Sequence, residues 1–305
     1  MWKKVDIVFK LKSPLHIGYM PFKGSVVSPT RYYVPGRNLW GAITKRVTEY
    51  LCKKPKADDY KKIGRQVMEN FRFSYFYLYD GRTIYFPRYT DEGLKYGNNK
   101  EEITKSEFER RFIGSLTSTA IDSNGTAKDE SLHEIEFINN RFKDESGDLK
   151  DVKIAGCIWV KENAKIEDKK VIINDTGIFI ENFSIIQELI LGGESKYGFG
   201  HVLLDPITRV ESSNLAPFKW KNPEKIEIKS NEPIVTHLKY SKNINFKGDI
   251  ELLAGRGYFD PQDPVKASDK PGKVILKPEY YLSPGTVLNV NITGRLNWDG
   301  TINKI

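Results

Sequence analysis

Short stretches in which apolar and polar residues alternate dominate this chain, and only a few stretches have helical spacing. Residues 5–11 alternate apart from Val8, which predicts a strand with one buried face. Residues 39–51 repeat apolar side chains at helical spacing, with Arg and Lys on the opposite side, and predict an amphipathic helix. The same kind of spacing over 58–71 predicts a second helix.

The middle of the chain combines an aromatic strand with a polar insertion. Aromatic residues alternate over 73–79, and the Asp-Gly pair at 80–81 marks a hairpin into a strand at 83–86. Residues 88–130 are polar and rich in Gly and Asn, which favours a long insertion.

The first two-thirds of the chain have the element order of an α+β fold. Strands are predicted over 132–142 and 152–160, and the apolar run 178–191 predicts a helix before a strand at 199–204. The order strand, helix, hairpin strands, helix, strand is the β-α-β-β-α-β order of a ferredoxin-like or RRM-like core. Such cores set an open antiparallel sheet beside two helices, and RNA often lies on the sheet or its loops.

The sequence changes character after residue 206. Residues 207–305 contain many short β-like runs, with several Pro and Gly, and no convincing helix. We therefore predict an RRM-like domain over 1–206 and a β-rich C-terminal domain over 207–305, with the boundary within 206–224.

Composition narrows the class of protein. The 305 residues carry a formal net charge of +8, which is compatible with a polyanionic partner without proving one. The two cysteines, Cys52 and Cys157, have no metal-ligand spacing and indicate a reducing compartment. The four histidines also lack a metal-ligand pattern, and we expect no metal and no cofactor. We expect no membrane association and a cytoplasmic location, because the chain starts without a signal-peptide pattern and has no membrane-length apolar run.

The most informative segment, residues 192–200, holds four glycines together with a cation and two aromatic rings. It lacks the Lys-Ser/Thr pair of a P-loop and the third glycine of a dinucleotide-binding loop. Residues 198–202 partly resemble the RNP1 signature of RRM domains. A tight turn would also use these glycines, but cations and aromatic rings beside them suit a nucleic acid strand. The predicted RNA contacts of this segment are Gly193, Lys196, Tyr197, Gly198, Phe199 and Gly200.

A second group of candidates surrounds the first helix. The sequence Ser-Pro-Leu-His-Ile-Gly over 13–18 is followed by a Pro-Gly turn that opens the helix near residue 37. A helix start offers unpaired N–H groups and a positive dipole end to an anion, although an ordinary capped helix has the same sequence features. The candidate RNA contacts here are His16, Gly18, Gly36, Arg37 and Lys45.

Taken together, the segments 13–18, 34–42 and 192–200 resemble the RAMP superfamily of CRISPR-associated proteins, and residues 119–137 resemble the middle region of its type III members. The resemblance covers about residues 3–206. It implies a subunit that binds crRNA, beside other CRISPR-associated subunits, in a type III antiviral effector complex.

Some members of the superfamily cut target RNA with an aspartate in the loop before the first helix. Residues 16–36 of this chain contain no Asp or Glu, which favours a non-catalytic, capping (Cas-five-like) member. Two alternatives stay open. His16 is a candidate general base for a metal-independent endoribonuclease that processes crRNA, and the basic surface also suits a subunit that binds only protein.

Overall fold

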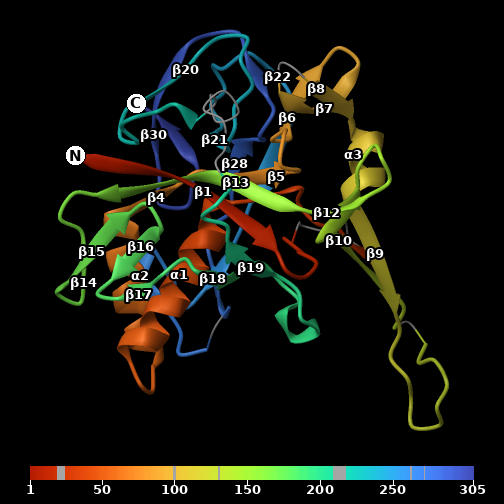
Figure 1. The fold of residues 1–305 in the computed structure, drawn as a ribbon, viewed down its shortest axis with the longest axis horizontal. Coiled ribbons are helices and arrows are strands. Elements are labelled where there is room, and N and C mark those ends of the chain that lie inside the picture. The colour runs from red at the N-terminus through yellow and green to blue at the C-terminus, as the bar shows by residue number, and fades with distance from the viewer. Residues whose placement is uncertain (19–24, 99–100, 130, 209–217, 262, 271) are drawn as a thin grey trace.

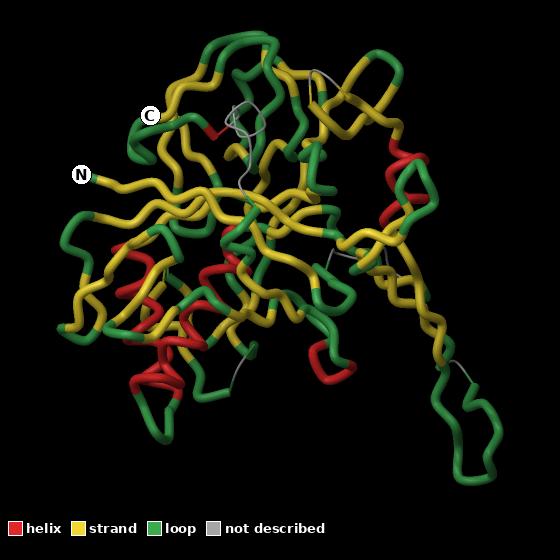
Figure 2. Tube along the Cα trace, viewed as in Figure 1, coloured by secondary structure: helices red, strands yellow, loops and turns green. Residues whose placement is uncertain are grey.

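The computed structural model describes residues 1–305 except 19–24, 99–100, 130, 209–217, 262 and 271. The predicted domain boundary therefore falls partly outside the described residues. Strands dominate the described part, which has three α-helices (Figure 2). None of these three helices is long and apolar enough to cross a membrane.

One curled, mainly antiparallel sheet of seven strands runs through the middle of the molecule (Figure 1). Its longest pairing joins β1 to β13, from Trp2 opposite Lys161 to Lys10 opposite Lys153. The strands, in sheet order, are β18 (Glu188–Ile190), β19 (His201–Leu204), β1 (Trp2–Leu11), β13 (Lys153–Lys161), β5 (Phe76–Tyr79) and β3 (Tyr33–Val34), and β4 (Phe71–Phe73) also pairs with β13.

Both faces of this sheet are covered. Helices α1 (Gly36–Leu51) and α2 (Ala57–Asn70) pack below it as drawn in Figure 1. On this side, Phe9 of β1 belongs to the same buried core as Ile43 of α1. The neighbouring Val8 points to the other face and joins a second core with strands of the C-terminal part. Because both faces are buried, β13 is apolar over almost its whole length, as buried strands are.

The C-terminal part forms a six-stranded sheet over the upper face, bonded to the central sheet. The Tyr77 hydroxyl donates to the Val235 carbonyl (2.7 Å), and the Trp159 indole N–H donates to the Trp220 carbonyl (3.1 Å). In order, the strands are β20 (Ile226–Ile228), β30 (Ile292–Leu296), β31 (Ile302–Lys304), β21 (Leu238–Lys239), β28 (Glu279–Leu282) and β23 (Ile250–Leu253). Short pairs beside it are β22 (Phe246–Lys247) with β29 (Val287–Leu288), β24 (Arg256–Gly257) with β27 (Val274–Ile275), and β25 (Phe259–Asp260) with β26 (Asp263–Ala267).

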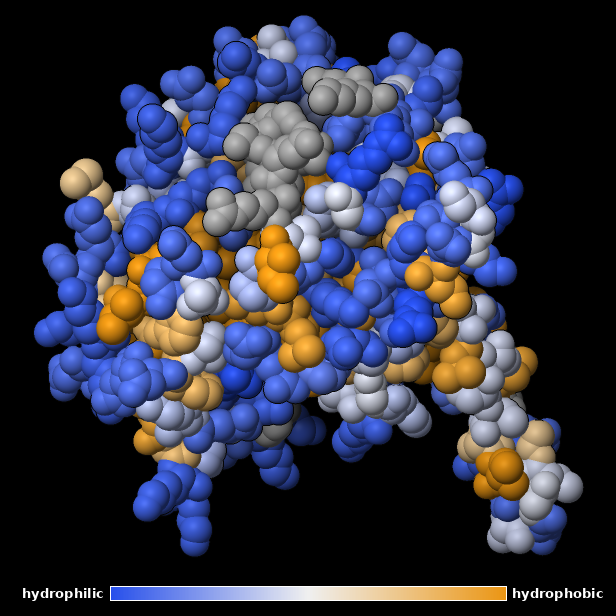
Figure 3. Space-filling model, in the orientation of Figure 1, coloured by the Kyte–Doolittle hydropathy of each residue, from blue (hydrophilic) through white to orange (hydrophobic). Residues whose placement is uncertain are grey.

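Strands and one helix make up the described part of the predicted insertion. Its hairpin of β9 and β10 projects far from the body, and apolar side chains gather along its stem on an otherwise mostly hydrophilic face (Figures 1 and 3). The elements within or at the edge of 88–130 are β6 (Phe86–Thr90), β7 (Gly93–Asn98), β8 (Glu101–Thr104), α3 (Lys105–Phe112) and β9 (Ile113–Ser118). Outside the insertion, β10 (His133–Ile138) pairs with β9 and with β2 (Val27–Ser28), and β11 (Arg141–Lys143) pairs with β12 (Leu149–Asp151).

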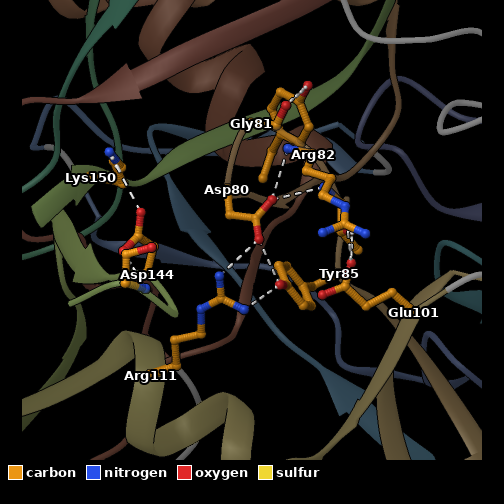
Figure 4. A network of polar contacts seen from close by, with 11 residues as sticks. Asp80, Gly81, Arg82, Tyr85, Glu101, Arg111, Asp144 and Lys150 are labelled. Carbon is orange, nitrogen blue, oxygen red and sulfur yellow. Dashed lines mark hydrogen bonds and ion pairs between the residues drawn. The ribbon is translucent and has the colours of Figure 1, made fainter. Parts of the chain in front are cut away.

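A buried ion pair anchors the insertion to the core (Figure 4). Arg111 of α3 pairs with the nearly buried carboxylate of Asp80 (3.0 Å) and donates to the hydroxyl of Tyr85 (2.7 Å), which itself donates to Asp80 (2.7 Å). Since all three partners are bonded to one another, α3 is held against the turn that follows β5.

The helix predicted over 178–191 is wrong. The segment forms β16 (Gly177–Ile180), β17 (Phe183–Ser184) and β18, and β16 pairs with β15 (Lys169–Asn174), which also pairs with β14 (Lys165–Ile166). Its apolar residues are mostly the β-branched Ile, which favours strands, and Glu181 adopts a positive φ of 55°, which no α-helix tolerates. The strand predicted over 73–79 is also interrupted, between β4 and β5.

Candidate nucleic-acid interface

The glycine-rich segment is the loop of a β-hairpin between β18 and β19, and not a helix-to-strand turn as predicted. It lies against the Ser-Pro-Leu-His-Ile-Gly segment. The N–H of Gly193 donates to the His16 carbonyl (2.9 Å), and the N–H of Gly200 donates to the Pro14 carbonyl (2.8 Å). We call these two hydrogen bonds the latch, because they fix the two ends of the loop to one strand extension.

Two of the glycines are required by close packing. Both Gly192 (φ 76°) and Gly200 (φ 85°) adopt left-handed conformations, and an added Cβ would lie 2.1 Å from the His16 carbonyl oxygen at the first and 2.0 Å from that of Leu191 at the second. Gly198 is also left-handed (φ 83°), but an added Cβ there would meet nothing within 4 Å. The glycine density therefore reflects the packing of the loop on its own molecule.

Most backbone N–H groups of the loop are already bonded. Besides the two in the latch, those of Tyr197 and Phe199 donate to the Glu194 carbonyl (2.9 and 3.4 Å), and that of Gly198 donates to the Ser195 carbonyl (3.0 Å). An RNA phosphate would have to compete with these bonds, so the side chains of the loop are better placed to contact RNA than its backbone.

Two side chains at the end of the loop face solvent and could contact RNA. Lys196 and Tyr197 lie on the 3-10 turn η1 (Ser195–Tyr197); both are exposed, and 70% of Tyr197 is accessible. We call these two residues the loop tip. Phe199 instead is buried and packs edge-to-face on Phe137 of β10 (ring centroids 5.3 Å apart), so its ring supports the loop.

His16 is almost completely buried, with 4% of its surface accessible. Its Nδ1 lies 2.7 Å from the Glu136 carbonyl oxygen, so Nδ1–H donates to that carbonyl and Nε2 is the ring nitrogen left for any acid–base role. The imidazole lies between Gly18 and Gly193, because a Cβ added to Gly18 would be 4.0 Å from Nε2 and one added to Gly193 would be 3.3 Å from Cδ2. A general base must reach its substrate, and this burial fits a structural role better.

Acidic side chains from other elements approach the acid-free loop 16–36, of which 19–24 lie outside the described residues. The Tyr32 hydroxyl donates to carboxylates of Glu109 (2.7 Å) and Glu136 (3.4 Å). Burial, reinforced by these two charges, raises the pKa of Tyr32 far above its usual value. The sequence separation of the partners explains why the loop composition alone did not reveal them.

The start of α1 faces the C-terminal part. A Cβ on Gly36 would lie 2.9 Å from the Asp299 carbonyl oxygen, so only glycine fits there without a shift. Arg37 reaches the Arg256 carbonyl (3.3 Å), and its guanidinium lies over the Trp298 ring, 5.9 Å from the centroid.

The predicted RNA contacts thus fall into separate places. Lys45 lies on the exposed side of α1, where it pairs loosely with Glu49 (3.9 Å). The residues at or beside the latch are His16, Gly18, Gly193, Lys196, Tyr197, Gly198, Phe199 and Gly200, and those facing the C-terminal part are Gly36 and Arg37.

A buried polar network near Arg37 was not foreseen from the sequence. The Tyr75 hydroxyl bonds to Nδ1 of His237 (2.7 Å), whose Nε2 donates to the carboxylate of Glu251 (2.8 Å). Glu251 also forms an ion pair with Arg31, which donates to the Tyr33 hydroxyl (3.0 Å). The network joins the loop before α1 to strands of the C-terminal part, and no local motif marks it.

The network fixes its own charge states. Burial lowers the pKa of His237 below its usual 6.5, even though Glu251 opposes this effect. Burial would raise the pKa of Glu251, but the hydrogen bond from His237 and the ion pair with Arg31 lower it to about 2. At neutral pH the network therefore contains a neutral imidazole, a carboxylate and a guanidinium.

A cavity of about 190 Å³ lies beside this network. It is bordered by the start of α1, the end of the 13–18 segment and three strands of the C-terminal part with their turns. Its lining includes Gly18, Arg37, Asn38, Lys277, Trp298 and Asp299.

In the described part of the chain, no group of three or more His, Cys, Asp or Glu side chains is arranged to hold a metal ion.

Comparison with known proteins bears on the fold. No protein-family model and no curated protein matches this chain. The structure is similar to a chain in the cryo-EM structure of the Type III-B Cmr-beta bound to cognate target RNA and AMPPnP, with a TM-score of 0.51 and 12% identity, covering 93% of this chain and 86% of that chain. A chain in the Cmr-beta structure bound to cognate target RNA gives a TM-score of 0.48 at 12% identity, over the same shares of both chains. At such low identity the similarity concerns the fold alone.

Proposed function

We propose that this protein is a non-catalytic subunit of a type III CRISPR effector complex, and that it binds crRNA through the loop tip. The strongest support is the loop tip itself. Lys196 and Tyr197 combine a mobile cation with an exposed ring, the two groups that bind a phosphate and stack on a base, on a loop fixed by the latch.

The wider features agree with this role. A fold shared with a chain of an RNA-bound Cmr-beta complex raises the expectation of RNA and neighbouring CRISPR subunits as partners, and the net charge of +8 suits a polyanion. The finer assignments, a ferredoxin-like or RRM-like RAMP core over 1–206, a β-rich domain over 207–305, a capping position and a cytoplasmic location, belong to this proposal. Because 178–191 forms strands, such a core would lack the helix of its second βαβ unit.

The endoribonuclease alternative is weaker because His16 is buried. General-base catalysis at Nε2 would require the loop 16–36 or the latch to open and admit a ribose 2′-hydroxyl. Holding RNA requires no such opening, since the loop tip already faces solvent.

One experiment separates the three candidates. Labelled repeat-containing RNA is incubated with the purified chain in the absence of metal, and both the mobility shift and cleavage are measured. A shift without cleavage is the expected result. Cleavage that is lost in His16→Ala would replace the proposal with the endoribonuclease, and neither shift nor cleavage would favour a subunit that binds only protein.

The loop tip is tested by the double variant Lys196→Ala/Tyr197→Ala. Losing one stacked base costs roughly 1–3 kcal/mol, so the affinity for RNA should fall roughly 5- to 150-fold. Losing one phosphate contact should reduce the slope of log affinity against log salt by about 0.7. The matched control Lys170→Ala/Tyr280→Ala removes an exposed Lys and an exposed Tyr elsewhere. Equal RNA affinities for the two double variants, with unchanged melting, would reject the loop tip as the contact.

A further inference from the structure

The cavity beside the buried network has the size of a single ring system. An engineered cavity of about 150 Å³ binds benzene, whereas pockets for drug-sized ligands have roughly 300–1,000 Å³. The 190 Å³ found here lies just above the first value. This volume suits one nucleobase.

An oriented aromatic side chain borders this space. Trp298 packs edge-to-face on Trp40 of α1, with ring centroids 4.7 Å apart, and the guanidinium of Arg37 lies on its ring. These contacts hold the plane of the indole, so that a flat ligand can stack without first ordering the side chain.

Polar groups without partners accompany the ring. The Asn38 side-chain amide makes no hydrogen bond to any described residue, and it lines the cavity. Asp299 accepts the N–H and hydroxyl of Thr301 (3.0 and 2.7 Å) with one carboxylate oxygen only. Its other oxygen has no donor within the described part of the chain. A carboxylate oxygen and an amide that line the same cavity suit a base edge that carries an amino group and a ring nitrogen.

One end of the cavity favours an anion. The first turn of α1 contains no acidic residue, and its N-cap, Pro35, provides no side-chain cap. Arg37 and Lys277 add two cations, and Lys277 forms no ion pair with a described residue. Three acidic side chains also line the cavity. Glu279 pairs with Lys239 at 2.8 Å, whereas Asp260 and Asp299 lie close enough to Arg37 to offset its charge, so the attraction for a phosphate comes mainly from Lys277 and the helix start.

The buried network gives this space a fixed wall. Tyr75 and His237 line the cavity, and both are held by the hydrogen bonds that lead to Glu251. A wall with satisfied hydrogen bonds keeps its shape when a ligand binds, which lowers the entropic cost of binding.

We propose that this cavity binds one nucleotide, with its base against Trp298 and its phosphate near Arg37 at the start of α1. The nucleotide is either one unit of a bound RNA, in which case the inference rests on the proposed function, or a free mononucleotide with the same chemistry. Gly18 lines the cavity and borders the ring of His16, so the cavity and the latch share the 13–18 segment. Bases with an exocyclic amino group should bind better than uracil.

The test uses the full chain and the double variant Asn38→Ala/Lys277→Ala, which removes one amide and one cation without touching the apolar core. The control is Asn245→Ala/Lys242→Ala, the same substitutions at exposed positions of the C-terminal part. Calorimetry measures binding of AMP, GMP, CMP and UMP, and a mobility shift measures binding of the repeat-containing RNA. Thermal melting verifies that both double variants are folded.

Loss of about fivefold or more in affinity for mononucleotides or for RNA, in the cavity variant and not in the control, supports the inference. Loss for RNA alone identifies a unit of the bound strand, and loss for mononucleotides alone identifies a free nucleotide. If the chain binds mononucleotides in this way but no RNA, the cavity inference stands and the proposed RNA-binding function falls. If the cavity variant and the control bind both probes equally, or if the chain binds neither probe, the inference is overturned.

Discussion

Gly198 and Gly200 make a matched pair for testing how the glycine loop is held. Their φ angles are almost equal, 83° and 85°, so Ala at either position carries the same left-handed strain of roughly 1–2 kcal/mol. They differ in their surroundings. The methyl group of Gly198→Ala meets nothing within 4 Å, whereas that of Gly200→Ala would lie 2.0 Å from the Leu191 carbonyl oxygen.

The contact at Gly200→Ala cannot be relieved by a side-chain rotation, because the methyl group would meet backbone atoms of Leu191. The Gly200 carbonyl accepts the Leu191 N–H (2.9 Å), and the Gly200 N–H donates to Pro14 in the latch (2.8 Å). Moving the chain apart sacrifices these two hydrogen bonds, at about 1 kcal/mol each, and adds an overpacking cost of about 1–3 kcal/mol. We therefore expect Gly200→Ala to lower the free energy of unfolding by about 4–7 kcal/mol, and Gly198→Ala by only about 1–2 kcal/mol.

Urea denaturation followed by circular dichroism measures both values, and the shift in the urea midpoint gives the difference if the two slopes agree. RNA binding by Gly198→Ala should stay within about threefold of the unmodified protein, because the loop tip and the latch are both retained. Two variants of equal stability would show that the loop does not pack on Leu191 and Pro14 as described, and the structural basis of the latch would be refuted.

Two other predictions concern buried charges. Because burial lowers the pKa of His237, the unfolded chain binds a proton below pH 6.5 that the folded chain does not bind, so the free energy of unfolding should fall as the pH drops from 6.5. Glu251 should add a second loss of stability as the pH falls from about 4.5 toward 2. His237→Gln should flatten the first part of a melting-temperature profile against pH, whereas His133→Gln, at an exposed site, should leave it unchanged; identical profiles would contradict the burial of His237. Arg111→Ala leaves the buried carboxylate of Asp80 without its cation and should lower the free energy of unfolding by about 3–5 kcal/mol. Arg110→Ala, at an exposed neighbouring position, should lower it by less than about 1 kcal/mol. Equal values for the two variants in urea denaturation would contradict this reasoning.

Local sequence patterns predicted those elements whose buried face is set by their own periodicity. The helices expected at 39–51 and 58–71 are α1 and α2, and the run at 152–160 is β13. The two helices follow from their helical period, and the continuous apolar run at 152–160 is typical of a strand that is buried on both faces.

The wrong prediction over 178–191 shows a case in which the hydrophobic pattern does not determine the type of element. An apolar run of that length is compatible with one helix or with several short strands, and periodicity does not distinguish the two. Turn residues decided the outcome here. Glu181 turns the chain with a positive φ between β16 and β17, and pairing with β15 then supplies the backbone hydrogen bonds.

The candidate site was predictable only in part, for a related reason. The residues of the loop and of the 13–18 segment stand together in the sequence and were found as motifs. The network that unites Arg31, Tyr75, His237 and Glu251 was invisible, because its members come from four distant segments with no fixed spacing. This network arises from the packing of the C-terminal sheet on the central sheet, and sequence periodicity does not specify that packing.

The two hydrogen bonds of the latch give the glycines of the loop a structural role. Gly192 and Gly200 are explained by their close approach to the backbone of residues 14–16 and 191, and this explanation needs no RNA. Under the proposed function, RNA would be contacted by the side chains that the loop presents to solvent, those of Lys196 and Tyr197. A cation and an exposed ring bind a phosphate and a base without reading the identity of the base, so the proposal implies binding with little sequence preference. Any preference for particular bases must reside elsewhere, and among the described residues the ring-sized cavity beside Trp298 is suited to provide it.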